Sequence, residues 1–292
     1  MNEHTEPGWP QGARPAPSEA GHQPATTCPN SHVAICRTQA AAVWHGGPMH
    51  AYDRFSAFYD AVMDDPGPRA DRVIEWIDRY VPEARSLLEL GCGTGSILAR
   101  LTNVPSLTGL DRSAEMLAVA RAKVTGARFV EGDMASFSLG ERFDVVICVF
   151  DSLNHLMAFS DWRSTFAAVH EHLADGGLFI LDVNTVGELR RLGDEPPWVY
   201  DFDEGTAIID VEFAEDAGSH GISLWDIRVF EHQGDSRYEL HHEQIGELGV
   251  PLPLIRAALA TGFTLLEETN EVGEPPTEES IKAHFVLRRQ AK

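Results

Sequence analysis

The feature that most constrains this fold is a buried apolar segment that ends directly in a glycine-rich turn. Residues 87–90 are mostly apolar, and glycines follow at alternate positions, Gly91, Gly93 and Gly95. An apolar run of this length bounded by turn residues is typical of a buried strand. Glycine permits positive φ angles and lets a ligand lie against bare backbone. Residues 97–101 are predicted to be helical, so the segment indicates a strand–turn–helix unit of an α/β sheet.

Acidic residues follow where the next predicted strands end. Residues 107–111 end in Asp111, which lies twenty positions after Gly91. At this distance a doubly wound sheet places an acid on the hydroxyl pair of a ribose. Ser113 is the predicted N-cap of a helix over 114–123. A short strand beginning at residue 128 leads to a second acid, Asp133.

Two further apolar segments complete the core of the predicted sheet. Residues 143–149 are almost wholly apolar, as strands buried on both faces of a parallel sheet are, and they lead into a loop of sequence Phe-Asp-Ser-Leu-Asn-His that ends at His155. Between these strands, residues 162–173 carry a helical apolar stripe with Ser160 as the expected N-cap. Gly176 and Gly177 then turn into a strand over 178–183.

These ordered segments resemble the motifs of the class I (Rossmann-like) S-adenosylmethionine-dependent methyltransferases. ELGCGTG is similar to their glycine motif, GLDRSAEML to their ribose-acid motif and EGDM to their adenine motif, and the resemblance runs from Tyr52 to the C-terminus. It implies an α/β fold with a doubly wound seven-stranded sheet, mostly parallel with the last strand antiparallel. Residues 263–271 and 283–289 would form its final antiparallel pair, after a helix over 254–260 capped by Gly262.

The resemblance also implies S-adenosylmethionine as the cofactor and assigns its contacts. Glu89, Gly91 and Gly93 would border its methionine and ribose parts, Asp111 would bind the ribose hydroxyls, and Asp133 would accept from the adenine amino group. The alternatives are structural: Asp111 as a helix cap and Asp133 as a turn acid. The remaining expected cofactor contacts are Tyr52, Cys92, Gly95, Arg112, Met116, Met134 and Phe150.

Other cofactor classes fit the sequence less well. A dinucleotide fingerprint has the spacing G-x-G-x-x-G, whereas this chain has G-x-G-x-G, so a nicotinamide oxidoreductase is only a remote alternative. The chain contains no G-x-x-x-x-G-K-[ST] segment, which argues against a P-loop nucleotidase. A methyltransferase acting on a protein or peptide, and a cofactor-binding protein without transfer activity, are the two other hypotheses.

Composition narrows the range of partners. The chain has 292 residues and a formal net charge of −22, from 45 acidic against 23 basic residues. Phosphate backbones are bound by clusters of Lys and Arg, and the sequence shows no such cluster, so neither nucleic acid nor an anionic membrane surface is expected as a partner. The apolar runs are strand-sized, no apolar signal core is present, and four cysteines lack a metal spacing. We therefore expect a cytoplasmic enzyme.

The first 48 residues differ in composition from the rest of the chain. Residues 1–48 are rich in Pro, Gly, Ala, Gln, Thr and His without periodicity, which predicts disorder, and Met49 is an alternative biological start. Residues 49–292 are the predicted methyltransferase domain. It begins with an apolar helical stripe at Tyr52, Phe55, Tyr59 and Val62, and a second helix over 70–81 follows a Pro-Gly-Pro break.

An insertion is predicted within that domain, over residues 184–249. Apolar and polar residues alternate in two stretches, 209–213 and 225–229, which together with the turn glycines predict a three-stranded antiparallel meander. An isolated sheet of this kind needs a partner for its apolar face. The meander should therefore cover the substrate side of the main sheet or form a homodimer contact, with Trp198, Tyr200 and Trp225 as the anchoring aromatic residues.

The start of the domain and the loop ending at His155 are similar to small-molecule methyltransferases, including amino-sugar N,N-dimethyltransferases and glycine-type N-methyltransferases. This implies a small-molecule acceptor, nitrogen rather than oxygen or carbon. Relatives commonly carry an aromatic-containing Asp-x-x-Tyr stretch after the first helix, where this chain has Pro66-Gly67-Pro68-Arg69. Contacts made there by relatives are therefore not transferred.

Three residues are candidates for the catalytic steps. His155 is the candidate general base, the alternative being a histidine that caps the next helix or bonds to backbone. Tyr59 is a candidate wall of the methyl channel, unless it is a core residue of an amphipathic helix. Asp151 is a candidate for holding a substrate amine or orienting Tyr59, unless it only stabilises a turn. Catalysis by alignment alone, without a base, is a further hypothesis.

No metal site is predicted. The run His241-His242-Glu243 offers ligand types, but neighbouring residues of a strand point to opposite faces of the sheet.

Overall fold

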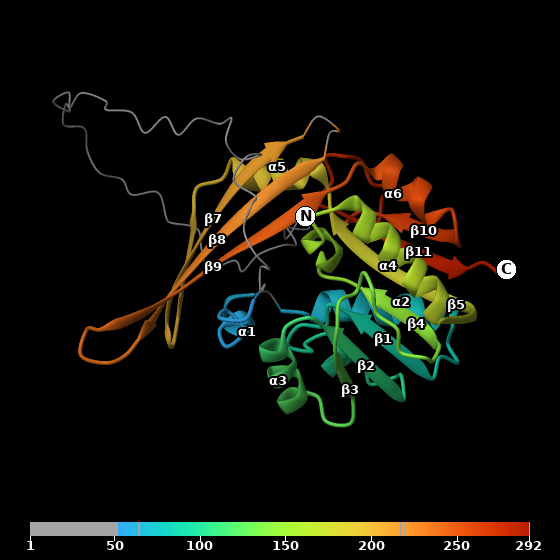
Figure 1. Cartoon of the computed structure of the whole chain (residues 1–292), viewed down its shortest axis with the longest axis horizontal. Helices are drawn as coiled ribbons and strands as arrows, with labels where there is room; N and C mark the ends of the chain where they lie inside the picture. Colours follow the sequence, from blue (N-terminus) through green and yellow to red (C-terminus); the bar gives the residue numbers. More distant parts are fainter. Residues whose placement is uncertain (1–51, 64, 217, 219, 292) are drawn as a thin grey trace, which may run out of the picture.

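A seven-stranded sheet forms the centre of the computed structural model, which describes residues 52–63, 65–216, 218 and 220–291 (Figure 1). The strand order is β10-β11-β5-β4-β1-β2-β3. Strand β11 runs antiparallel to both neighbours and the other pairs are parallel, which confirms the predicted fold class. The strands are β1 Ser86–Leu90, β2 Ser106–Asp111, β3 Arg128–Glu131, β4 Phe143–Cys148, β5 Leu173–Asn184, β10 Phe263–Thr269 and β11 Lys282–Arg289.

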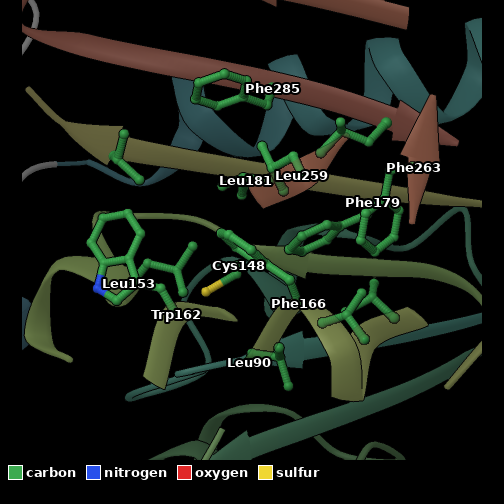
Figure 2. Close-up of a cluster of buried hydrophobic side chains, with 14 of the residues drawn as sticks. Leu90, Cys148, Leu153, Trp162, Phe166, Phe179, Leu181, Leu259, Phe263 and Phe285 are labelled. Carbon is green, nitrogen blue, oxygen red and sulfur yellow. The ribbon is translucent and has the colours of Figure 1, made fainter. Parts of the chain in front are cut away.

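Helices cover both faces of this sheet because successive strand residues point to opposite sides. Leu88 packs in the same cluster as Trp162 of α4 (Phe159–His172) and Ile255 of α6 (Leu252–Leu259). Leu87 packs on the other face with residues of α2 (Gly67–Tyr80) and α3 (Ala114–Lys123). Figure 2 shows the first of these faces, where Trp162 and Phe166 lie beneath the strands. The buried central strands explain the long apolar runs of the sequence.

A second, four-stranded antiparallel sheet lies between β5 and α6 in the chain. Its order is β6-β7-β8-β9, with β6 Trp198–Phe202, β7 Gly205–Glu215, β8 Gly221–His232 and β9 Tyr238–Gly249. The predicted three-stranded meander therefore lacks one strand of the observed sheet. Strand β6 was missed because it carries only a short alternation, and it is added to the sheet by pairing of residues 198–202 with β7.

The apolar face of this inserted sheet is covered from within the same chain. Ile209 of β7 and Ile227 of β8 pack in one cluster with Leu189 of α5 (Val186–Gly193) and with Phe55 and Phe58 of the N-terminal segment 52–63. The N-terminal segment lies between the inserted sheet and the carboxyl edge of the main sheet (Figure 1). The inserted sheet and the N-terminal segment, which are far apart in sequence, therefore both cover the site described below.

Two predicted helices are shorter than expected. The stripe from Tyr52 to Val62 is a series of turns that ends in a single helical turn, α1 (Tyr59–Val62). Its aromatic residues pack against the inserted sheet. The Phe55 amide also donates to the Glu243 carboxylate at 3.1 Å. After the glycine turn, only the 3₁₀ turn η2 (Leu98–Arg100) replaces the helix predicted over 97–101.

Two predicted caps were also wrong. Helix α4 begins at Phe159 with Ala158 as its N-cap, so Ser160 lies inside the first turn. Helix α6 ends with Ala260 as its C-cap, and Gly262 does not have a positive φ. Gly262 instead lies close to the His170 ring, which a Cβ at this position would approach to 2.9 Å.

The third predicted cap is confirmed. Ser113 precedes α3, and its side chain accepts from the Met116 amide at 3.1 Å. This bond satisfies one of the free amides in the first turn of the helix.

The predicted N-terminal tail, residues 1–48, lies outside the described residues. No helix in the described part of the chain is long and apolar enough to cross a membrane.

The packing around Trp162 yields a stability prediction. Its side chain is fully buried and its indole N–H donates to the Leu156 carbonyl at 2.9 Å. Trp162→Ala should lower the free energy of unfolding by about 3–5 kcal/mol through lost burial and a residual cavity. Leu254→Ala, at a position 41% exposed, should change it by less than about 0.5 kcal/mol. Equal urea midpoints for the two variants would contradict this account of the core.

Candidate active site

The carboxyl ends of β1, β2 and β4 open into a cavity of about 310 Å³. Doubly wound sheets bind their ligands at this edge. The cavity is also bounded by the N-terminal segment 52–63 and by Ile245 and Gly246 of β9. Among the residues predicted to contact the cofactor, those that line it are Tyr52, Glu89, Gly91, Cys92, Gly93, Asp111, Arg112, Met116, Asp133, Met134 and Phe150.

Gly95 differs from that expectation. It is not among the residues lining the cavity, and a Cβ at this position would lie 3.2 Å from both Ala120 and Val124 of the α3 region. Its positive φ of 74° and this close approach explain the glycine by packing of the turn against α3. The alternate glycines of the turn therefore have different tasks.

The Asp111 carboxylate is fixed by backbone groups from two segments. It ends β2, and its Oδ2 accepts from the Gly93 amide at 2.8 Å while its Oδ1 accepts from the Ser113 amide at 2.9 Å. Burial raises the pKa of this carboxyl, and the backbone donors oppose that rise. Each carboxylate oxygen retains a further acceptor position. Asp111 can therefore accept from the two hydroxyls of a ribose without rearrangement.

The remaining cavity wall also fits S-adenosylmethionine. A Cβ built on Gly93 would meet no atom within 4 Å, so bare backbone is open to a ligand there. The buried Glu89 Oε2 has no hydrogen-bond partner among the described residues, and burial raises the pKa of this carboxyl. An ammonium group would supply the missing donor. In the described part of the cavity wall there are four acids (Asp60, Glu89, Asp111, Asp133) and one arginine, which suits a cationic cofactor without phosphate better than a pyrophosphate.

The N-terminal segment is attached to this cavity by an ion pair. Lys123 Nζ, at the end of α3, lies 2.5 Å from Asp60 Oδ2 and donates to Thr94 and Ser96 at 3.0 and 2.8 Å. Asp60 belongs to α1, whereas Thr94 and Ser96 belong to the glycine turn. The contact therefore holds α1 against the mouth of the cavity.

His155 and Tyr52 form a hydrogen-bonded pair over the same cavity. His155 Nδ1 lies 3.4 Å from the Gly246 carbonyl, and Nε2 lies 3.2 Å from the Tyr52 hydroxyl. A carbonyl can only accept, so Nδ1 carries the proton and Nε2 accepts from Tyr52. Burial lowers the pKa of His155 despite the nearby Asp151 carboxylate. The imidazole is therefore neutral at pH 7, with its acceptor nitrogen directed at the tyrosine.

Tyr59 lies beside this pair without joining it. Its ring meets that of Tyr52 edge to face with centroids 5.5 Å apart, and it also lines the cavity. Burial raises the pKa of the Tyr59 hydroxyl, and Asp151 adds to the rise. Tyr59 is therefore placed to shape the cavity as a neutral phenol.

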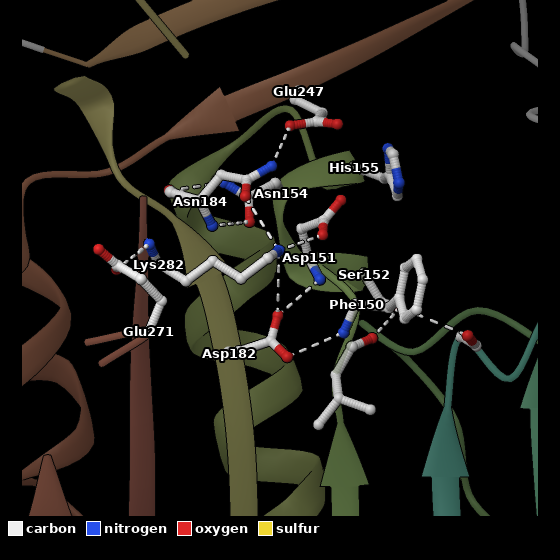
Figure 3. A network of polar contacts seen from close by, with 12 residues as sticks. Phe150, Asp151, Ser152, Asn154, His155, Asp182, Asn184, Glu247, Glu271 and Lys282 are labelled. Atoms are coloured by element: carbon white, nitrogen blue, oxygen red, sulfur yellow. Dashed lines mark hydrogen bonds and ion pairs between the residues drawn. The ribbon is translucent and has the colours of Figure 1, made fainter. Parts of the chain in front are cut away.

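A second, smaller cavity of about 50 Å³ adjoins the first, since Tyr52, Met63 and Phe150 line both. Asp151 lines this smaller cavity and not the larger one. Its carboxylate pairs with Lys282 Nζ at 2.5 Å rather than with the Tyr59 hydroxyl. Figure 3 shows Lys282 reaching in to end among Asp151, Asp182 and Asn184.

Asp182 holds the loop that separates the two cavities. Its carboxylate accepts from the amides of Phe150 and Asp151 at 3.0 and 2.8 Å. Both residues have positive φ, 66° and 52°, which is costly for residues other than glycine. Burial would raise the pKa of Asp182, but the Lys282 ammonium at 3.6 Å and these amides hold it below its usual value.

Buried charges in the smaller cavity balance one another. Burial tends to lower the pKa of Lys282, but Asp151 and Asp182 outweigh this and raise it, so the amine stays charged. Glu247 of β9 is 3% exposed and accepts from Asn184 Nδ2 at 3.1 Å. Burial and the Asp151 charge raise the pKa of Glu247 to about 8. Its carboxyl is thus largely protonated at neutral pH.

Among the described residues, groups with metal-ligand chemistry occur in two places. Ligand atoms of Asp151, His155 and Glu247 lie within 4.8 Å of one another, but the Lys282 ammonium already supplies a positive charge to that cluster. The second group includes His241, which bonds to Glu231. Its neighbour His242 bonds to a different acid, Asp226, so the two histidines do not converge on one point.

Sequence analysis did not single out Lys282, Glu247 or Asn184 as site residues. Asp182 could have been found from the sequence, because an acid near the end of a buried apolar strand needs hydrogen-bond donors or a counter-charge. Lys282 could also have been found, since the chain has only three lysines and this one begins an apolar strand. Glu247 could not, because its burial depends on how the inserted sheet docks.

The fold and the cavity define an α/β protein built to bind a nucleoside cofactor that lacks phosphate. A family model described as a methyltransferase domain matches residues 87–177. The chain is 32% identical over 201 residues to the putative methyltransferase YqeM of Bacillus subtilis, covering 66% of this chain and 79% of that protein.

Two further comparisons extend this similarity. Over 142 residues the chain is 33% identical to a dTDP-3-amino-3,6-dideoxy-alpha-D-glucopyranose N,N-dimethyltransferase of Streptomyces fradiae, covering 47% of this chain and 56% of that protein. The solved structure of an S-adenosylmethionine-dependent methyltransferase of Clostridium acetobutylicum superposes with a TM-score of 0.71 at 24% identity, over 82% of this chain and 99% of that one.

The chain therefore belongs to the class I S-adenosylmethionine-dependent methyltransferases. It is an enzyme whose cofactor is S-adenosylmethionine.

Asp111 provides a direct test of the cavity. Asp111→Ala should weaken S-adenosylmethionine binding by about 1–3 kcal/mol, because buried hydroxyl and amide donors lose their acceptor. Glu115→Gln, an exposed neighbour in the first turn of α3, should leave the affinity unchanged. Calorimetric titration of both variants makes the comparison, and unaltered affinity in Asp111→Ala would exclude the ribose contact.

Glu247 should make stability depend on pH. Its folded-state pKa of about 8 lies above the unfolded value of about 4.3, so its contribution to stability is complete below the unfolded value and is lost as pH rises through the folded value. Between about pH 5 and pH 9 the wild type should lose more stability than Glu247→Gln, as measured by urea unfolding. Glu239→Gln, exposed on the same strand, should behave like the wild type. Parallel pH curves for wild type and Glu247→Gln would disprove the shift.

Proposed function

We propose that this enzyme transfers a methyl group from S-adenosylmethionine to the nitrogen of a small-molecule amine. The observation that carries this proposal is the meeting of two cavities at Tyr52, Met63 and Phe150. One cavity has the size and polarity for the cofactor, and the other is small and partly aromatic, with acidic and basic side chains in its wall. A reactant in each would meet at the shared wall.

In this proposal the cofactor occupies the larger cavity. Asp111 accepts from the ribose hydroxyls, Asp133 and Met134 lie at the adenine, and Glu89 faces the methionine ammonium. When bound, the cofactor supplies an electrophilic methyl group on a sulfonium. The protein's contribution is then to align a nucleophile within about 3–3.5 Å and to exclude water.

An amine acceptor suits the hydrogen-bond acceptors and the aromatic faces of the smaller cavity. Asp151, Glu188 and Glu247 line it together with Trp225 and Phe55, so that carboxyl oxygens can accept from the amine N–H groups and aromatic faces attract an ammonium. At about 50 Å³ the cavity accommodates only the reacting end of an acceptor. The similarity to an amino-sugar N,N-dimethyltransferase supports nitrogen as the acceptor atom.

The amine must be neutral before it can attack, and the Tyr52–His155 pair provides a path for its proton. The Tyr52 hydroxyl already donates to His155 Nε2. As Tyr52 passes its proton to this neutral imidazole, its oxygen can take one from the acceptor ammonium, so the tyrosine ends unchanged. Tyr59 forms part of the cavity wall beside them. Asp151 lies on the acceptor side, where it is fixed by its ion pair with Lys282.

Inserted strands complete the acceptor side. Ile209 of β7, Trp225 and Ile227 of β8 and Glu247 of β9 all contribute to the wall of the smaller cavity. We assign residues 184–249 as the acceptor-side insertion of a domain spanning 49–292. The internal cover on its apolar face also removes the need for a second subunit there.

Substitutions at the proton path test the mechanism. His155→Ala and Tyr52→Phe should each reduce kcat by about 10²–10⁴-fold if the pair accepts the proton, and this loss should persist at saturating cofactor. Tyr59→Phe keeps the ring and should retain most activity. Steady-state assays with labelled cofactor and a panel of amines, phenols and amino acids supply the readout. A small loss in His155→Ala, with a pH profile set only by the substrate, would instead support alignment alone.

A further inference from the structure

Arg69 stands out among the residues that line the smaller cavity. It lies in the first turn of α2, and its guanidinium carbon sits 3.9 Å from the centre of the Phe150 ring. Phe150 lines both cavities, and Arg69 lines only the smaller one. The stack therefore fixes a guanidinium beside the point where the two cavities meet.

No carboxylate of the described residues lies within 4.0 Å of the Arg69 nitrogens. The other cation of this cavity, Lys282, differs, because it bonds to Asp151 and Asn184 and approaches Asp182. A guanidinium carries five N–H donors. Stacking on a ring face uses none of them, so the in-plane donors of Arg69 remain available.

The helix gives no reason for an arginine at this position. Cations in the first turn oppose the helix dipole, which favours negative charge there. The first turn of α2 contains no acidic residue that would offset the cation. In a chain of net charge −22, a half-buried cation without an acidic partner among the described residues points to a ligand that brings its own negative charge.

We propose that Arg69 binds an anionic group of the acceptor, a carboxylate or a phosphate carried near its amine. The planar guanidinium matches both groups through paired hydrogen bonds, and the Phe150 stack presets its plane. This inference rests on the proposed function, because it assigns the acceptor to the smaller cavity. The preferred acceptors are then amines with an acidic group, recognised at the two ends by opposite charges.

The test uses matched pairs of small amines that differ in one negative charge. Glycine with glycinamide probes a carboxylate, and phosphoethanolamine with ethanolamine probes a phosphate. Methyl transfer from labelled S-adenosylmethionine measures turnover, and calorimetry on the protein saturated with S-adenosylhomocysteine measures binding of the same probes. The variants are Arg69→Gln and Arg69→Lys. The control is Arg79→Gln on the same helix, where Arg79 pairs with Glu267 and lines neither cavity.

Arg69→Gln should weaken binding of the preferred anionic probe about tenfold to a hundredfold and raise its KM to match. Binding of the neutral partner and of the cofactor should stay unchanged, as should all values in Arg79→Gln. Arg69→Lys keeps the charge without the paired geometry, so its loss should be smaller. It also keeps the test valid if the glutamine variant folds poorly.

Two outcomes would overturn this inference. Failure of the wild type to bind either anionic probe would do so, as would an equal loss of charged and neutral probes in Arg69→Gln, which would mark a structural role. The proposed function fails separately, by absence of methyl transfer to any amine. If the anionic probes bind through Arg69 but no amine is methylated, the anion site stands and the proposed amine methyltransferase activity is rejected.

Discussion

The Asp182 carboxylate is the interaction on which the rest of the site depends. Two consecutive residues, Phe150 and Asp151, adopt left-handed backbone geometry after β4, and Asp182 accepts from both of their amides. These hydrogen bonds offset the conformational cost of the two positive φ angles and so stabilise the turn. The turn places Phe150 between the two cavities, Asp151 in the smaller one and Ser152 against Gly91.

A buried carboxylate of this kind needs a counter-charge, and the topology supplies it. Because β11 runs antiparallel to β5, its first residue arrives at the same edge where β5 ends, and Lys282 pairs in register with Asn184. From there its ammonium reaches both Asp151 and Asp182. Removing one partner of such a buried group leaves an uncompensated charge. The one antiparallel strand of the main sheet therefore has a functional consequence.

Much of this could be predicted from the sequence, and the limits have a physical origin. The parallel strands and the acids at their ends follow from apolar runs and spacing, which are local. The coil around Tyr52 could not be predicted, since its helical stripe is overridden by packing on the inserted sheet and by the bond from Phe55 to Glu243. The roles of Lys282, Glu247 and Arg69 also stayed hidden, because each depends on contacts between segments far apart in the chain.

Distribution of charge links the two cavities into one chemical argument. The charged residues described in the wall of the larger cavity are mainly carboxylates, which suits a cationic cofactor. Methyl transfer removes the positive charge from the sulfonium, and in the proposed reaction a neutral amine gains one. In that proposal the positive charge moves from the Glu89 and Asp111 side towards Asp151 and Glu247, and carboxyl groups border both ends of the path. A fixed cation directly on the path would oppose this movement. Lys282 is neutralised by its acids, and Arg69 stands at the edge on the Phe150 face. An anionic group on the acceptor would neutralise that last cation as well, so that binding of the acceptor itself completes the electrostatic arrangement for transfer.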